Sequence, residues 1–525
     1  MAATSDPTPA EADAPQPRAG LLPLTVSGVA ATAAGLALGA LVAQFVGPEY
    51  APVTAIGNRL VDLLPADIVN WGKDTLGQAD KPILIVGVAV VALALGAVAG
   101  ILTRRHRQLA WAVIAPVTVL SLAAAYSAPA ASFPLAGAPS AVTIAVAAPL
   151  LYGLVERAEL RTRADGRPNP VARRSFLAWL GGTTAAAAVG LGTERMIDAA
   201  IAAPADEAVT LPAAVASETV PAGAELGIDG LTPYVTPAKD FYRIDTALVV
   251  PRVSAEAWTL QINGMVRNPI TISYADLVAR NLVEHATTLT CVSNVVGGDL
   301  AGNAVWLGLP VRELLAEAEP LPGADMVLSR SADGWTAGTP LEALTDPGRE
   351  ALLAVGMNGA PLPREHGYPV RMVVPGLYGY VSATKWVVEL KLTTFAADEG
   401  YWTPLGWAAR GPIKLASRID VPRAAGGAPT AGDVVVAGVA WAQHTGVAAV
   451  EVRVDGGAWQ PAELAEAVSA DTWRQWHWTW VASPGEHTLE CRAQDATGAW
   501  QTELVAPPAP DGSSGLHSRT VTVAG

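Results

Sequence analysis

Long apolar runs are concentrated in the first two hundred residues of this 525-residue chain. A helix that crosses a membrane needs roughly 20 mostly apolar residues. The pattern therefore predicts a membrane domain at residues 21–200 with about five transmembrane helices. A buried helical domain is the alternative, but so many runs with so few charges disfavour it. The expected spans are about 21–46, 82–102, 109–126, 140–155 and 175–193.

Arginines gather in two of the loops between these runs, and their placement predicts the orientation. One loop holds Arg104, Arg105 and Arg107. The positive-inside rule places such loops in the cytoplasm. Five spans then put the chain beyond about residue 200 on the outer side of a bacterial cytoplasmic membrane, with the lipid bilayer as a partner. The second loop, before the fifth run, contains Arg157, Arg161, Arg163, Arg167, Arg173 and Arg174.

The segment Arg173-Arg174-Ser175-Phe176-Leu177 directly precedes the fifth apolar run. Paired arginines followed by Phe and Leu before a mild, Ala/Gly-rich stretch are typical of a twin-arginine export signal. The alternative is that both arginines only anchor the helix on the cytoplasmic side. Export by this route carries folded proteins, which matters if a cofactor must be inserted in the cytoplasm first.

The pattern changes on either side of the membrane domain. Residues 1–20 are rich in Ala, Pro, Asp and Glu and are expected to form a disordered tail. Residues 201–230 read as a Pro/Ala/Glu-rich linker. Residues 231–422 mix strands with short helices, an α+β pattern. Residues 423–525 contain several short strands separated by turn residues, which predicts a β-sandwich of the immunoglobulin type.

Charge and cysteine usage exclude two classes of protein. The formal net charge is −14, and no basic stripe is present to meet phosphates, so nucleic acid is not an expected partner. Two cysteines exclude a disulfide scaffold, although a single bridge between Cys291 and Cys491 stays open. Cys491 shares strand parity with Leu489 and Ala493, so a core position is its simplest explanation.

Cys291 carries the strongest chemical signal. It lies in Thr290-Cys291-Val292-Ser293-Asn294, between a β-prone run and a turn at Gly297-Gly298-Asp299. A thiolate is the form of cysteine that binds metals or attacks electrophiles.

Further motifs follow in order: Phe241-Tyr242-Arg243, Ser331-Ala332-Asp333-Gly334, the run from His366 to Arg371, Val374-Pro375-Gly376 and Lys385-Trp386. With these motifs, residues 231–525 resemble the molybdopterin-binding oxidoreductases of the sulfite oxidase family. The resemblance implies an α+β cofactor domain followed by an immunoglobulin-like dimerisation domain, and hence a homodimer. It also implies molybdenum with molybdopterin as cofactor, and oxygen-atom transfer as the reaction.

The resemblance assigns roles residue by residue. Cys291 matches the thiolate that ligates molybdenum, and a soft thiolate suits a metal already held by sulfur. Trp407 stands near the position of an active-site tyrosine. Considered alone, each of the remaining matches is more simply a surface group or a satisfied polar residue. The residues that match cofactor-binding positions are Tyr242, Arg243, Ser331, His366, Arg371, Thr384 and Lys385.

Substrate-binding positions depart from the family pattern. Sulfite oxidases carry arginines shortly after the ligand cysteine, whereas Val295 and Val296 stand here. Arg410 and Lys414 follow Trp407 closely in sequence and could restore some positive charge to the substrate pocket. A less charged or bulkier oxo-donor or oxo-acceptor than sulfite is therefore expected.

Haem ligands are not apparent in the sequence. It contains no Cys-x-x-Cys-His motif, and His106, in a predicted cytoplasmic loop, is the only histidine before His285. We therefore expect no haem and a separate electron-transfer partner. The sequence as a whole predicts a membrane-anchored, outward-facing molybdoenzyme. A sulfoxide reductase of the same fold and a non-catalytic, membrane-tethered binding protein are the alternatives.

Overall fold

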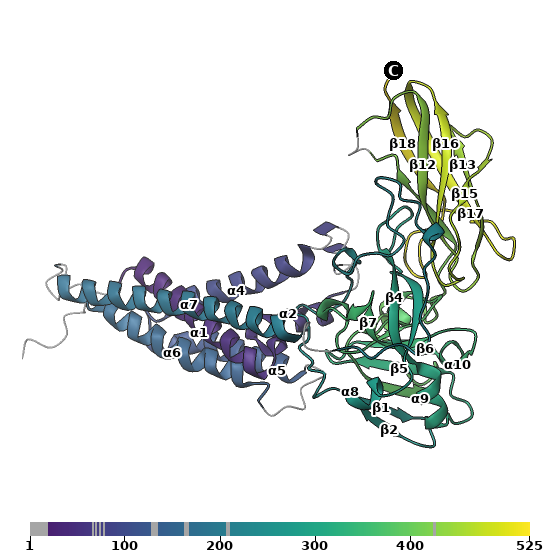
Figure 1. Ribbon diagram of the computed structural model, residues 1–525. Coiled ribbons are helices and arrows are strands. Elements are labelled where there is room, and N and C mark those ends of the chain that lie inside the picture. Colours follow the sequence, from purple (N-terminus) through teal and green to yellow (C-terminus); the bar gives the residue numbers. More distant parts are fainter. Residues whose placement is uncertain are drawn as a thin grey trace, which may run out of the picture. The chain divides into compact units, whose positions relative to one another are not determined.

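The computed structural model describes residues 19–65, 68, 71–72, 75–76, 79–127, 135–161, 167, 169–205, 210–423 and 427–525. Most of the predicted disordered tail, Arg163 of the second arginine-rich loop and residues 206–209 of the predicted linker lie outside these ranges. The chain forms two compact units (Figure 1). One comprises Met1–Ala203 with Ala247–Arg252, and the other comprises Pro204–Thr246 with Val253–Gly525.

The first unit is helical, and within its described residues five helices are long and apolar enough to cross a membrane. All five coincide with predicted runs, and the last helix is longer than expected. They are α1 (Leu21–Val46), α4 (Asp80–Leu102), α5 (Trp111–Ser127) with the preceding turn from Arg107, α6 (Ala138–Glu159) and α7 (Pro170–Ala205) as far as Ile197.

Small residues let these helices pack closely. A Cβ added to Gly28 of α1 would lie 1.9 Å from the Gly96 carbonyl oxygen of α4. A Cβ added to Gly39 would lie 2.0 Å from the Thr143 hydroxyl of α6. Glycine at such crossings allows helix backbones to approach where water supplies no hydrophobic driving force.

A further helix, α2 (Pro52–Leu63), lies between the first two spans and was not expected. Its 12 residues include Asn58, Arg59 and Asp62, so it is too short and too polar to read as a span. Hydropathy over a long window does not reveal an amphipathic helix of this length.

The second unit begins with an α+β region built on one mixed sheet and one antiparallel sheet. Trp258 is buried, and its indole nitrogen donates to the Val387 carbonyl at 2.7 Å. The first sheet has the order β2 (Ile270–Ser273), β1 (Thr259–Gly264), β10 (Val387–Thr393), β5 (Met326–Ser331) and β6 (Thr336–Pro340). The second has the order β3 (Val283–Thr290), β4 (Ala301–Pro310), β7 (Leu352–Met357) and β8 (Ala360–Pro361), with β9 (Arg371–Val373) paired to β7.

Short helices join these strands: α8 (Tyr274–Val278), α9 (Val311–Ala318) and α10 (Leu341–Thr345). The start of α8 is capped, as serine followed three residues later by aspartate favours. The Ser273 hydroxyl accepts from the Asp276 backbone, and the Asp276 carboxylate accepts from the Ser273 backbone, which forms a capping box.

The C-terminal region consists of two four-stranded antiparallel sheets. Leu489, Cys491 and Ala493 alternate on β17 and are all buried, as their strand parity predicted. One sheet has the order β11 (Ala416–Val421), β12 (Gly432–Trp441), β16 (Arg474–Ala482) and β15 (Glu463–Leu464). The other has the order β14 (Gln460–Pro461), β13 (Val447–Val454), β17 (Gly485–Asp495) and β18 (His517–Val523).

The Cys291–Cys491 disulfide that the sequence left open as an alternative does not form. Both cysteines are free, and the Cys491 thiol lies in the core of the C-terminal sheets, where Ser417 Oγ donates to it at 3.3 Å. The described part of the predicted linker packs along the start of β3. Val215 N donates to Leu282 O, and Glu284 N donates to Ala216 O, each at 2.8 Å.

Candidate functional site

Cys291 is placed by the end of β3 and by a tight turn that follows it. Its backbone N–H donates to Leu300 O at 2.9 Å, and its carbonyl accepts from Asn294 N at 3.0 Å. The Asn294 side chain closes the turn by accepting from Leu300 N at 2.9 Å. The cysteine is only 8% exposed. A thiol fixed in this way has a defined direction for ligation.

The C-terminal sheets hold the far side of this turn. Arg418 donates to the Gly298 carbonyl at 2.7 Å, and Ser513 Oγ donates to the Asn294 carbonyl at 2.6 Å. Gly297 has a φ of +76°, and a Cβ there would lie 2.2 Å from the His517 ring. Glycine is therefore required both by backbone conformation and by space.

Aromatic side chains form one wall beside the cysteine. Phe241 stacks on Tyr242 with ring centroids 5.3 Å apart. It also meets Trp306 and His366 edge-on, at 5.7 and 5.6 Å. Burial raises the pKa of Tyr242 above its usual range, and Cys291 and Arg371 lie close enough to act on it electrostatically. The Phe241-Tyr242-Arg243 motif therefore lies close to Cys291 and Arg371.

Arg371 is a buried cation, 4% exposed. Within the described residues its hydrogen bonds go to the backbone carbonyls of Met372, His366 and Ala383, at 3.3, 3.0 and 3.4 Å. Its guanidinium lies 5.0 Å from the centre of the Trp306 ring. Burial lowers the pKa of Arg371 to about 10. Carbonyl dipoles neutralise a charge only partly, so this environment suits an anion.

Lys385 lies nearby and is also buried. Its ammonium donates to Asp245 Oδ2 at 3.0 Å, and Arg243 Nε reaches the same oxygen at 3.2 Å. Burial lowers the pKa of Lys385 to about 8, although Asp245 opposes that shift. Asp245 thus joins two residues of the predicted site, and no sequence motif had pointed to it.

His366 presents an open hydrogen-bonding atom. Its Nε2 lies 2.9 Å from the Ala238 carbonyl, which assigns the proton to that nitrogen. Burial, reinforced by Arg371, lowers the pKa of His366 to about 4, so the ring is neutral at pH 7. Its Nδ1 is buried and has no hydrogen-bond partner among the described residues. It is therefore an acceptor available to a bound donor.

Ser331 and Thr384 are buried in the same region. Thr384 Oγ1 lies 2.7 Å from Ser329 Oγ, so its hydroxyl already has a protein partner. Ser331 ends β5, and its hydroxyl accepts from Asp333 N at 3.4 Å. Burial raises the pKa of Asp333, and Asp245 adds to that rise.

The residues considered for substrate binding are either apolar or already paired with an opposite charge. Val295 is 55% exposed. Arg410 pairs with Glu342 at 3.0 Å, and Lys414 pairs with Asp511 at 2.9 Å. Each cation thus already has a carboxylate partner.

Trp407 is half-buried in an aromatic group, 6.3 Å from Trp402 and 6.0 Å from Tyr380.

Tyr378 was missed by sequence reasoning. It is 4% exposed, and burial raises its pKa to about 12 with Cys291 among its electrostatic neighbours. Its only sequence signal was its position just after the Val374-Pro375-Gly376 motif.

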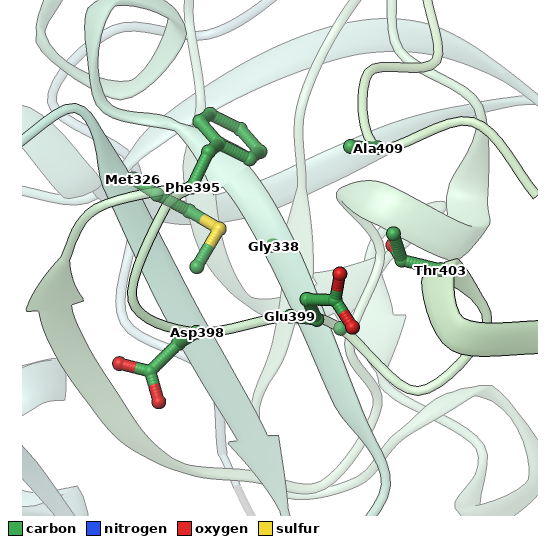
Figure 2. Close-up of a pocket in the computed structure, with 8 residues that line it drawn as sticks. Met326, Gly338, Phe395, Asp398, Glu399, Thr403 and Ala409 are labelled. Atoms are coloured by element: carbon green, nitrogen blue, oxygen red, sulfur yellow. The ribbon is translucent and has the colours of Figure 1, made fainter.

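A small hollow at the edge of the first sheet is separate from these residues. Figure 2 shows Met326 and Phe395 on one side of it and Thr403 and Ala409 on the other. None of the predicted site residues lines it. We therefore locate the candidate site at Cys291 and the buried cations.

The residues at Cys291 fit a molybdenum–pterin group. A buried thiol supplies a soft ligand, Arg371 and Lys385 supply positive charge for a phosphate, and His366 supplies an unpaired acceptor. No feature of this set conflicts with such a group.

Comparisons with known proteins agree with that fit. Residues 247–402 match the family described as oxidoreductase molybdopterin binding domain. Sulfite oxidase of Gallus gallus is 29% identical over 324 residues, covering 52% of this chain and 69% of that protein. Mitochondrial sulfite oxidase of Homo sapiens is 29% identical over 356 residues, covering 58% and 64%. The match thus spans about two thirds of the length of these animal relatives.

A bacterial relative is covered more fully. The uncharacterized oxidoreductase YuiH of Bacillus subtilis (strain 168) is 33% identical over 154 residues, which is 29% of this chain and 74% of YuiH. The family match contains Cys291, Arg371 and Lys385, while Tyr242 and Trp407 lie just outside it. The buried thiol, the buried cations and these relatives together show that the chain belongs to the sulfite oxidase family of molybdopterin-dependent oxidoreductases.

Proposed function

We propose that the chain is a membrane-anchored enzyme that transfers an oxygen atom to or from a small substrate of low charge, on the outer side of the cytoplasmic membrane. The observation that carries this proposal is Arg371, a buried guanidinium that bonds only to carbonyls within the described residues. A cation held in this way is stabilised when a phosphate arrives.

The roles of the residues follow from their environments. Cys291 would ligate molybdenum, and Arg371 and Lys385 would hold the pterin phosphate. His366 would accept a hydrogen bond at Nδ1 because burial keeps its ring neutral. Molybdenum bound to the pterin supplies two-electron oxygen-atom chemistry. Tyr242 and Phe241 close one side and exclude water. Ser331 and Thr384 would line the cofactor site. Arg243 would act on Lys385 through their shared partner Asp245.

Low substrate charge is inferred from the surroundings of the Cys291 turn. The side chains of Val295 and Val296 offer no hydrogen bonds, and the carboxylates of Glu342 and Asp511 offset Arg410 and Lys414. Burying a dianion beside valine is costly. Trp407 would line the approach. A sulfoxide reductase of this fold is the second candidate, and a non-catalytic binding protein is the third.

The helical unit is proposed to anchor the enzyme in the membrane. Support comes from the five apolar helices and from the arginines of the two loops. Arg173 and Arg174 lie in the first turns of α7, where they would serve as an export signal or as anchors. Electrons would leave through a separate partner. The two C-terminal sheets are proposed to be an immunoglobulin-like sandwich that forms a homodimer.

Replacing Cys291 with Ser should abolish turnover and remove one sulfur from the molybdenum X-ray absorption spectrum. Cys491→Ser is the matched control, because that thiol lies in the sheet core. It should lower the melting temperature and leave the spectrum unchanged. Normal activity of the Cys291 variant would refute the ligand assignment.

Replacing Lys385 with Met should reduce molybdenum and pterin content, because one charge-assisted contact worth roughly 1.5–3 kcal/mol is lost. That loss corresponds to roughly a tenfold to hundredfold weaker cofactor affinity. Lys391→Met is the control, since Lys391 is a partly exposed partner of Asp398. A double variant with Asp245→Asn also removes the buried carboxylate that pairs with Lys385. Full cofactor content in that double variant would contradict the role of Lys385.

Steady-state kinetics should show poor sulfite oxidation and better turnover of sulfoxides or N-oxides. Val296→Arg should raise kcat/KM for sulfite by about tenfold, because one charge-assisted contact is restored. Val481→Arg adds the same charge at an exposed valine of the C-terminal sheets and should have no effect. Efficient sulfite oxidation by the unaltered enzyme at micromolar substrate would overturn the low-charge assignment.

A reporter that is active only in the cytoplasm should be silent when fused after residue 525 and active when fused after Arg105. Both results follow from five spans with arginine-rich loops inside. Activity of the C-terminal fusion would show that the orientation is wrong.

A further inference from the structure

A cluster of four ionisable side chains lies where the C-terminal sheets meet β3, the strand that leads into Cys291. Within the described residues β3 is an edge strand, paired on one side with β4. Its other edge is covered by the chain itself. Ala216 forms a parallel bridge with Val283, and segments of the C-terminal sheets cover the last residues of the strand.

The contacts at the end of β3 are specific. Thr288 N donates to Asp471 O at 3.0 Å, and Trp473 N donates to Thr288 Oγ1 at 2.7 Å. Gln443 Nε2 donates to Thr288 O at 3.1 Å and to Thr290 Oγ1 at 3.3 Å. Thr290 directly precedes Cys291. The position of the cysteine therefore depends on how the C-terminal sheets dock against this strand.

Charged groups hold the same junction. Asp471 binds two histidines, with Oδ2 2.9 Å from His285 Nε2 and Oδ1 3.1 Å from His444 Nδ1. The second nitrogen of His285 lies 3.3 Å from Glu218 Oε2. Both ring nitrogens of His285 thus face carboxylates, and only an imidazolium can donate to both. The side chain is 15% exposed, so water screens the cluster weakly.

Other ionisable groups around the cluster are few. His444 Nε2 lies 3.8 Å from Asp346 Oδ2, and the phenol of Tyr234 lies near Glu218. Glu218 comes from the segment before the α+β region, His285 from β3, and Asp471 and His444 from loops of the C-terminal sheets. Three parts of the chain therefore meet at one imidazolium.

We propose that the Glu218–His285–Asp471–His444 cluster is an electrostatic latch that docks the C-terminal sheets on β3 and thereby positions Cys291. His285 is a positioning residue, because it acts through β3 and does not touch the reacting atoms. The latch does not depend on the proposed activity or on bound molybdenum.

The latch should respond to pH in a defined direction. Burial alone would lower the pKa of His285, but its hydrogen bonds to Asp471 and Glu218 prevail and raise it to about 9. A raised histidine pKa stabilises the docked state fully below its ordinary value, and this contribution is lost as the pH rises through about 9. The pKa values of Glu218 and Asp471 are lowered, so their contribution is lost as the pH falls through the acidic range.

Hydrogen–deuterium exchange on the full-length protein in detergent tests the latch. The reporters are the amides of Thr288 and Trp473, which donate across the junction. The reference is Val436, in the middle of the β12–β16 pairing. Protection factors are used because intrinsic exchange itself depends on pH. Between pH 7 and pH 10, protection of the reporters relative to Val436 should fall by at least about tenfold.

His285→Gln should show the low relative protection already at pH 7 and should lose the pH step. His487→Gln is the matched control, because His487 pairs with Asp455 at 2.7 Å within the C-terminal sheets, away from β3. It should behave as the unaltered protein does. The proposal is overturned if relative protection in the unaltered protein is constant from pH 7 to pH 10, or if His487→Gln causes the same loss. The pH step needs no variant, so a folding defect in His285→Gln leaves the test intact.

Discussion

Burial of positive charge beside Cys291 is the constraint on which the rest of the catalytic region depends. Arg371 lies in the interior with backbone carbonyls as its partners, and Lys385 shares one carboxylate with Arg243. Removing such cations from water costs several kcal/mol unless opposite charge compensates them. The surrounding sheets must therefore be rigid enough to hold this arrangement until an anion binds. Trp306 beside Arg371 and Trp386 beside Lys385 are both buried and contribute large contact surfaces to that rigidity.

The C-terminal sheets are part of this constraint. They cover the edge of β3 and hold the Cys291 turn through Arg418 and Ser513. An uncovered edge strand would expose unpaired backbone groups and leave the turn mobile. Hydrogen bonds from the C-terminal sheets to the backbone of the Cys291 turn hold that turn in place. They therefore fix the position of the Cys291 thiol. The two regions therefore act as one unit, although their sequences differ in pattern.

The proposed chemical specificity follows from which cations already have carboxylate partners. Among the described residues, Arg410 and Lys414 have carboxylate partners, whereas the hydrogen bonds of Arg371 go to backbone carbonyls. A paired surface cation contributes little to anion binding, while a buried one with incomplete compensation contributes much. On the proposed assignment, the buried cation holds a phosphate, and the region of paired cations receives a substrate of low charge.

The sequence by itself determined the apolar spans, the capped helix at Ser273, the buried parity of β17 and the motif around Cys291. Each of these is local, because hydropathy, capping and strand alternation act over a few residues. Helix α2, the packed segment before the α+β region, Asp245, Tyr378 and the latch at His285 were decided only by the tertiary structure. Their partners lie far away in sequence, as for His285 and Asp471, 186 residues apart. Burial and pairing of charge depend on which distant segments meet, and no local pattern encodes that.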